Sequence, residues 1–194
     1  FRAGGYSLMS YKNYIQLLKT NDIRIDSSVT AGRRITKLHE YDYTKAPTYT
    51  YWRYNDNLLT PELNGYFHEY RIKAIGPYYS LKYIYLKRML QKKYSPLFSY
   101  NDGLSHINRL NRLKELFLKL FQKQSFHACT DGLMAANLIN IYRKSCEEND
   151  DMVVIGHPKC TTDASLKLTE KFIQYAKAQG ACFKKIDESL LYNQ

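Results

Sequence analysis

The chain has 194 residues, of which 44% are hydrophobic, and its formal net charge is +11. This length predicts a single domain over residues 1–194 with a sizeable core, and the charge suggests either an anionic partner or simple solubility. No apolar run reaches the length of a membrane-spanning helix and no signal peptide is visible, so the cytoplasm and the cell envelope both stay open as locations.

The first third of the chain is predicted to contain one helix, one short strand and a long irregular segment. Apolar residues recur at three- and four-residue steps over residues 8–21, which predicts a helix, and residues 23–25 alternate like a strand. Residues 30–65 lack clear periodicity but are rich in aromatic residues, which argues against disorder. We expect an ordered, aromatic-rich insertion or binding loop there, with Trp52 as its largest anchor.

Helices and strands alternate over the rest of the chain. We predict strands at residues 66–75, 125–129, 152–155 and 181–186, and helices at residues 80–93, 104–123, 132–147 and 163–179. Gly180 is expected to end the last helix in the left-handed conformation. This alternation favours an α/β fold with parallel strands.

Tyrosines and basic residues are the unusual part of the composition. The 19 tyrosines either line a half-wet surface or replace phenylalanine in the core. Residues 71–101 include seven Lys or Arg, interleaved with tyrosines, and no Asp or Glu. This pattern suits nucleic acid or an anionic glycan, and it also suits the solvated face of an amphipathic helix. One possible function is therefore a non-catalytic binding protein that uses residues 30–65 and the helix at 80–93.

Polar residues follow two of the predicted strands, where parallel α/β folds build their sites. His157 could transfer a proton near neutral pH, or it could be a structural histidine that hydrogen-bonds its loop. Asp26 could hold a histidine in its charged form, or it could cap its own turn. After Arg2, Gly4 and Gly5 would let the backbone approach a ligand closely and offer N–H groups to an oxyanion.

Three segments occur in an order that is characteristic when they are taken together. They are Phe1-Arg2-Ala3-Gly4-Gly5-Tyr6, Ile25-Asp26-Ser27-Ser28-Val29 and Val153-Val154-Ile155-Gly156-His157-Pro158-Lys159. In this order and spacing they resemble the polysaccharide deacetylase family, the NodB-homology carbohydrate esterases. Residues 65–72 are similar to the family's strand that carries a glutamate, with Glu69 at the matching place. The resemblance extends from Phe1 to Ile186.

The resemblance implies a partial or distorted (β/α) barrel of the glycoside hydrolase/deacetylase type, with its N-terminal strands missing from this chain. Such enzymes hydrolyse N-acetyl groups of amino sugars with a divalent metal, commonly zinc, that polarises the acetamide carbonyl and activates water. By resemblance, His157 is the general acid, Asp26 supports it and Arg2 orients the catalytic carboxylate. Tyr6 lies near the backbone oxyanion donor, and Tyr6 and Trp52 are the expected substrate-binding residues.

The chain departs from the family in its metal ligands. The family uses an Asp and a His-x-x-x-His pair, whereas the histidines here are at positions 39, 68, 106, 127 and 157. The four cysteines form no four-ligand zinc pattern, and Asp26 lacks the Trp that usually follows it. We therefore expect zinc in the complete protein only, and this chain alone to be inactive and to bind no metal.

The expected partner is an N-acetylated glycan or sugar precursor, and nucleic acid is not expected to bind. A barrel without its first strands would expose a sheet edge and core surface. We expect self-association, or residues 30–65, to cover that edge.

Overall fold

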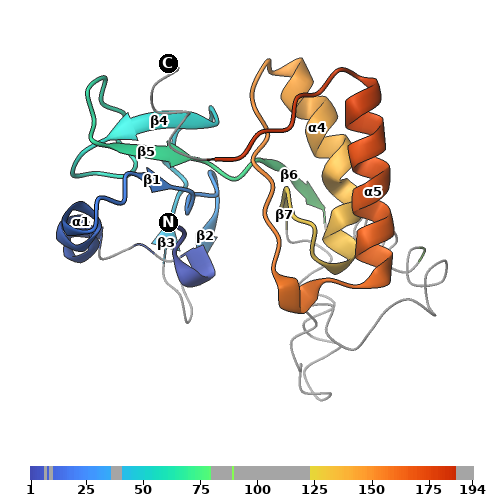
Figure 1. Cartoon of the computed structure of the whole chain (residues 1–194), viewed down its shortest axis with the longest axis horizontal. Coiled ribbons are helices and arrows are strands. Elements are labelled where there is room, and N and C mark those ends of the chain that lie inside the picture. The colour runs from blue at the N-terminus through green and yellow to red at the C-terminus, as the bar shows by residue number, and fades with distance from the viewer. Residues whose placement is uncertain (7, 9–10, 36–40, 80–88, 90–122, 187–194) are drawn as a thin grey trace. The chain divides into compact units, whose positions relative to one another are not determined.

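A computed structural model describes residues 1–6, 8, 11–35, 41–79, 89 and 123–186 of the chain. The chain divides into two compact units. Unit 1 comprises Phe1–Lys73, Ser145–Val153 and Ala181–Gln194, and unit 2 comprises Ala74–Lys144 and Val154–Gly180. Each unit contains both helix and sheet (Figure 1).

Unit 1 begins with one short turn and one helix. The 3-10 turn η1 covers Gly4–Tyr6, and helix α1 covers Tyr11–Thr20, which confirms the helix predicted over residues 8–21. Asp22, with a positive φ of 49°, turns the chain after α1 and leads it toward the first strand.

The strands of unit 1 form a three-stranded sheet and a separate two-stranded one. The larger sheet joins β1 (Ile25–Asp26), β5 (Phe67–Tyr70) and β4 (Tyr51–Tyr54) in that order; β1 runs parallel to β5, and β4 antiparallel to it. The smaller sheet pairs β2 (Arg34–Ile35) with β3 (Tyr41–Asp42) in antiparallel register. Three strands therefore lie within the segment that was predicted to be one irregular insertion or loop.

Aromatic side chains fill the core of unit 1. Tyr41, Tyr54 and Phe67 are fully buried. The register of β4 against β5 sets Tyr54 opposite Phe67, and their rings stack with centroids 5.3 Å apart. Tyr41 stacks on Tyr43 at 4.8 Å. In this core, tyrosine takes the place that phenylalanine usually has, which is one of the two interpretations left open by the composition.

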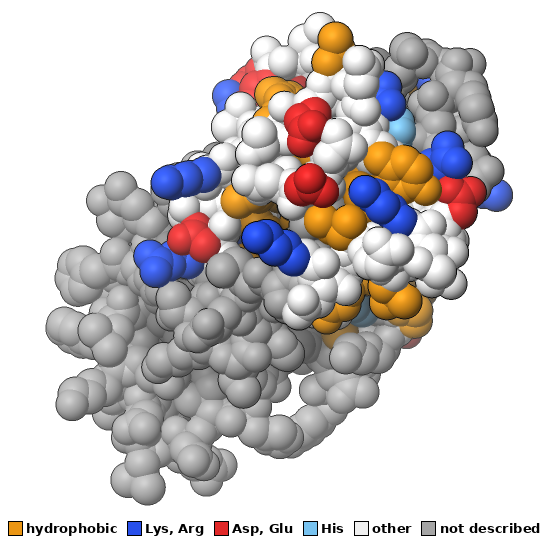
Figure 2. All heavy atoms as spheres, turned by 90° about the vertical axis from the view of Figure 1, so that its left-hand side faces the viewer, with side chains coloured by type: hydrophobic (Ala, Val, Ile, Leu, Met, Phe, Trp, Pro, Cys, Tyr) orange, Lys and Arg blue, Asp and Glu red, His pale blue; other side chains and the backbone are white. Residues whose placement is uncertain are grey.

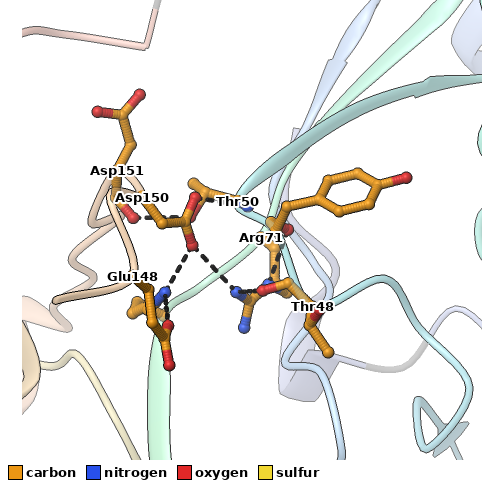
Figure 3. Close-up of polar contacts among 8 residues, drawn as sticks. Thr48, Thr50, Arg71, Glu148, Asp150 and Asp151 are labelled. Atoms are coloured by element: carbon orange, nitrogen blue, oxygen red, sulfur yellow. Dashed lines mark hydrogen bonds and ion pairs between the residues drawn. The ribbon is translucent and has the colours of Figure 1, made fainter. Parts of the chain in front are cut away.

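A buried ion-pair cluster attaches the segment around Asp150 to the rest of unit 1 (Figure 3). Lys73 Nζ donates to Glu148 Oε2 at 2.7 Å and to Asp150 Oδ2 at 2.5 Å, and its side chain is only 2% exposed. Arg71 Nη2 lies 3.5 Å from the same Asp150 oxygen, and the Thr50 amide donates to Asp150 Oδ1 at 3.0 Å. Two cations face two carboxylates, so the burial of Lys73 leaves its charge compensated.

Unit 2 combines an antiparallel strand pair with two helices. The strands are β6 (Ala74–Tyr79) and β7 (Lys123–His127). A 3-10 turn, η4 (Gly132–Asn137), leads into α4 (Leu138–Glu147), which belongs to unit 2 up to Lys144; η5 (Pro158–Cys160) precedes α5 (Asp163–Ala178). The helix predicted at 163–179 is confirmed, and the one predicted at 132–147 is present as η4 followed by α4.

Helices α4 and α5 lie side by side (Figure 1). The ring of Tyr142 meets Phe172 and Tyr175 edge-on, with centroids 6.2 Å apart in both cases. Thr162 begins α5 through a reciprocal pair of hydrogen bonds with Ser165. Gly180, at φ +84°, follows the end of α5 in the left-handed conformation that the sequence predicts.

The predicted (β/α) barrel is wrong for the residues that the structure describes. They form a small mixed α/β arrangement in which no sheet closes into a barrel. The alternation of helices and strands predicts parallel pairing, but β4–β5 and β6–β7 pair antiparallel, and among the named strands only β1–β5 is parallel. Short antiparallel pairs close locally, so they do not build the repeated parallel crossovers that a barrel needs.

Several strand predictions also differ in detail. Residues 66–75 divide between β5 and β6, and residues 181–186 form no strand. Residues 152–155 contribute single parallel bridges, Ile72 with Val153 and Cys129 with Ile155, instead of a continuous strand. The helices predicted at 80–93 and 104–123 lie almost entirely outside the described residues.

Candidate functional site

The carboxyl end of β1 in unit 1 holds two buried carboxyl groups next to each other. Asp26 on β1 pairs in parallel register with Glu69 on β5, so both side chains lie on one face of the sheet. Asp26 Oδ1 accepts a hydrogen bond from the Ser28 hydroxyl at 2.6 Å, and Glu69 Oε1 accepts one from the Val29 amide at 2.8 Å. Among the described residues, Asp26 Oδ2 and Glu69 Oε2 have no hydrogen-bond partner.

Burial controls the protonation of this carboxyl pair. It raises the pKa of Asp26 to about 6, although the hydrogen bond from Ser28 acts in the opposite direction. Burial and the neighbouring Asp26 raise the pKa of Glu69 well above its ordinary value. Two adjacent carboxyl groups away from water cannot both ionise without a large energetic cost, so the pair retains a proton near neutral pH.

The first residues of the chain are attached to the same strand end. The Phe1 amino group donates to the Ile25 carbonyl at 2.7 Å, and Arg2 Nε donates to the Ser27 carbonyl at 2.9 Å. Arg2 Nη2 also donates to Ser27 Oγ at 3.2 Å. The structure thus brings together two of the three predicted catalytic residues, Arg2 and Asp26, with the guanidinium bound to the residue that follows the aspartate.

The two predicted substrate-binding residues occupy different environments. Trp52 is only 3% exposed, and its indole N–H donates to the Leu58 carbonyl at 2.8 Å, so it is a core anchor. Tyr6 is half-buried at the border of this core, with a positive φ of 63°, and its carbonyl accepts a hydrogen bond from the Tyr43 hydroxyl at 2.6 Å. Of the two, Tyr6 keeps more of its surface accessible.

His157, in unit 2, has a carboxylate partner that the sequence did not indicate. Its Nδ1 lies 2.5 Å from Asp131 Oδ2, and its backbone amide donates to Asp131 Oδ1 at 2.7 Å. The aspartate therefore binds both the ring and the backbone of the histidine. The His157 side chain is 46% exposed and that of Asp131 is 17% exposed. Among the described residues, Nε2 has no hydrogen-bond partner, so this nitrogen is available to a substrate.

The backbone of unit 2 holds these two residues in place. Cys129 and Ile155 form a parallel bridge, and the Thr130 amide donates to the Ile155 carbonyl at 2.8 Å. Gly156 comes so close to this segment that a Cβ added there would lie 2.2 Å from Thr130 Oγ1. The absence of a side chain at Gly156 therefore leaves room for the Thr130 hydroxyl between the segments that carry Asp131 and His157.

The electrostatics of this site differ from those of the buried carboxyl pair. Burial acts to raise the pKa of Asp131, but hydrogen bonds from the backbone and ring of His157 outweigh it, and the pKa is lowered overall. Asp131 is therefore ionised at neutral pH and accepts the Nδ1 proton of the imidazole. Burial raises the pKa of the nearby Cys129 thiol to about 12, so in the metal-free protein this thiol stays protonated.

Asp131 and Cys129 are the site residues that sequence reasoning missed. They lie more than 25 residues before His157, and no motif connects the two segments. The available signal was that the strand predicted at 125–129 is followed within two residues by an acidic residue, as the strand at 23–25 is followed by Asp26. Of the predicted catalytic residues, Asp26 lies in unit 1 and His157 in unit 2, where Asp131 is its hydrogen-bond partner.

The surface gives no support to a nucleic-acid interface on the face that Figure 2 shows. Among the described side chains of that face, Lys and Arg are scattered between apolar and acidic groups and do not gather into one basic field. Most of the basic stretch at 71–101 lies outside the described residues. In the described part of the chain, no helix has the length and apolar character that crossing a membrane requires.

The family's metal-ligand pattern does not fit the residues of this chain, which has no His-x-x-x-His pair. The described residues offer a different donor group, made of Cys129, Asp131 and His157. Neither a scan against protein-family models nor searches of curated proteins and solved structures found a match to this chain. Its function must therefore be inferred from the site itself and from the order of the sequence motifs.

Proposed function

We propose that this protein hydrolyses the N-acetyl group of a glycan or amino-sugar precursor, with His157 as the proton donor to the departing amine. The observation that carries the proposal is the 2.5 Å contact between His157 Nδ1 and the Asp131 carboxylate. A carboxylate on one ring nitrogen fixes the tautomer and orientation of an imidazole and stabilises its protonated form. The half-exposed His157 is thus oriented for proton transfer through Nε2.

The chemistry of amide hydrolysis requires such a group. When the acetamide C–N bond breaks, the nitrogen must gain a proton in order to leave as an amine, while water supplies the hydroxyl that ends up in acetate. Because the ionised Asp131 holds the Nδ1 proton, Nε2 is the nitrogen that takes up a proton from the attacking water and then passes it to the departing amine. A positioned histidine of this kind contributes roughly 10²- to 10⁴-fold to a rate.

The order of the motifs supports the substrate class. Arg2 and Asp26, to which the resemblance to the polysaccharide deacetylases assigns catalytic roles, lie at one strand end. In that family a divalent metal polarises the acetamide carbonyl. Because the family's ligand pattern does not fit this chain, the step that we assign to its residues is proton transfer alone.

The test is acetate release from N-acetylglucosamine oligomers by the full-length protein and matched variants. We expect His157→Ala to lower the rate by roughly 100-fold or more, the loss typical of removing a general acid. Asp131→Asn should lower it by about tenfold or more, because the asparagine no longer favours the required tautomer. Asp163→Asn changes an exposed aspartate of unit 2 and should leave the rate unchanged.

Two results would contradict the proposal. Full activity in His157→Ala would show that the histidine transfers no proton in the slow step. The absence of acetate release by the full-length protein from all such oligomers would exclude the proposed substrate class.

A further inference from the structure

Three metal-binding side chains of different chemistry converge in unit 2. The donor atoms of Cys129, Asp131 and His157 all lie within 4.8 Å of one another. The ligand atoms of a tetrahedral zinc ion are roughly 3 to 4 Å apart, since each lies about 2.0 to 2.3 Å from the metal. A small inward movement of these side chains would therefore let all three reach one ion.

The fold holds two of the donors on one segment and the third on its neighbour. Cys129 and Asp131 are two residues apart, directly after β7, and His157 follows the neighbouring segment. The parallel bridge between Cys129 and Ile155, together with the hydrogen bond from Thr130 to Ile155, holds the segments together. The donors are thus brought close by backbone contacts, which a metal ion does not have to create.

The types of donor indicate the class of ion. Thiolate and imidazole favour zinc and related transition metals, whereas magnesium and calcium require oxygen ligands. Three protein donors also leave the fourth position of a tetrahedral ion open to water. This ligand set differs from the one that the family resemblance implies. It has one cysteine, one aspartate and one histidine, whereas the family uses an Asp and a His-x-x-x-His pair.

We propose that Cys129, Asp131 and His157 form a binding site for zinc or a similar soft divalent cation. Binding replaces the thiol proton of Cys129 by the metal, and the proton is released to solvent. The ion also takes a ring nitrogen of His157. A metal-bound His157 cannot serve as the proton donor, so zinc inhibits the proposed reaction. Only this last consequence rests on the proposed function.

The primary test is cobalt(II) titration of the reduced, metal-free protein, because a cobalt–thiolate bond gives a charge-transfer absorption in the near ultraviolet. We expect about one equivalent of cobalt to develop this band. Zinc should abolish it, because zinc binds the same kinds of ligand and displaces cobalt without giving an absorption of its own. Asp131→Asn and His157→Gln should each weaken cobalt binding by at least about tenfold, since even indirect supports of a metal site contribute that much.

Cysteine variants identify the thiolate. Cys129→Ser should abolish the band, whereas Cys146→Ser and Cys182→Ser change exposed free cysteines and should leave it intact. Because Cys129 is fully buried, its variant is informative only if it retains the wild-type circular dichroism spectrum. If it does not, the half-exposed His157→Gln variant tests the metal site. A missing band in the wild-type protein, or unchanged binding in His157→Gln, would overturn the proposal.

The activity measurement separates this inference from the proposed function. If both hold, zinc inhibits acetate release over the concentration range in which it displaces cobalt. If the protein releases no acetate, the cobalt titration still tests the metal site. If zinc occupies the site and the rate does not change, the metal site stands and the role of His157 as proton donor is refuted.

Discussion

Asp26 in unit 1 and Asp131 in unit 2 both follow a predicted strand, yet their surroundings give them opposite properties. Asp26 is buried beside Glu69, one of its oxygens has no hydrogen-bond partner in the part of the chain that the structure describes, and burial raises its pKa to about 6. Asp131 accepts hydrogen bonds from the backbone and ring of His157, and its pKa is lowered. The residue type is the same, so the difference comes from hydrogen-bond partners and access to water. The buried pair of Asp26 and Glu69 therefore retains a proton near neutral pH, whereas the partly exposed Asp131 is ionised.

The largest change in stability that we expect comes from the buried ion-pair cluster around Lys73, in which the cations and carboxylates compensate one another. Lys73→Met removes the cation between Glu148 and Asp150 and leaves Arg71 alone to balance them. The free energy of unfolding should fall by about 3 kcal/mol, as expected when one partner of a buried ion pair is lost. Urea denaturation measures it, with the exposed Lys12→Met as control. Equal stability of the two variants would show that the cluster is not a stabilising feature.

Two glycine substitutions compare how tightly the backbone is packed around a glycine in each unit. A Cβ at Gly65 in unit 1 would lie 2.3 Å from the Tyr54 backbone nitrogen, whereas a Cβ at Gly156 in unit 2 would meet the side-chain oxygen of Thr130. A side chain can rotate away and a strand backbone cannot. We expect Gly65→Ala to destabilise the protein by roughly 2 to 3 kcal/mol and Gly156→Ala by less than about 1 kcal/mol in thermal unfolding. A larger loss of stability in Gly156→Ala than in Gly65→Ala would contradict the tighter backbone packing around Gly65.

The pH dependence of stability should reveal the stored proton of unit 1. The pKa of Asp26 is raised in the folded state, so between pH 4 and about 6 the folded chain binds more protons than the unfolded one. Its contribution to stability is present below pH 4 and is lost as the pH rises through about 6. The change is roughly 3 kcal/mol at most, because the rise from 3.8 to about 6 is about two pKa units and one unit corresponds to about 1.4 kcal/mol. Asp26→Asn should make this slope shallower in urea titrations at pH 4 to 7, because only Glu69 of the pair then still titrates with a raised pKa. A slope equal to that of the wild-type protein would show that Asp26 does not cause it.

Asp131 should give the smaller slope of opposite sign in the metal-free protein. Its lowered pKa means that its contribution to stability is present above the unfolded-state value near 3.8 and is lost as the pH falls through the lower folded value. Because the site is partly exposed, we expect only about 1 kcal/mol. Comparing Asp131→Asn with wild type at pH 3 and pH 6 in the presence of a chelator measures it. A larger difference at pH 3 than at pH 6 would contradict the hydrogen bonding of the ionised Asp131 carboxylate to His157.

Local sequence patterns predicted the parts of this protein that depend on neighbouring residues. The three- and four-residue apolar steps that predict α1 reflect the geometry of a single helix, and Gly180 ends α5 as its conformational freedom suggests. Asp26 and His157 were also singled out locally, because each follows an apolar run. These features require no knowledge of which distant segments meet.

The tertiary structure alone decided which segments pair and which groups become partners. Antiparallel pairing of β4 with β5 and of β6 with β7 replaces the predicted barrel, since the same alternating pattern fits a strand of either direction. Glu69 becomes the neighbour of Asp26, and Asp131 the partner of His157, although each pair is far apart in the sequence. Composition and order placed the reactive side chains at the ends of segments, but their protonation follows from burial and hydrogen bonding, which only the folded chain creates.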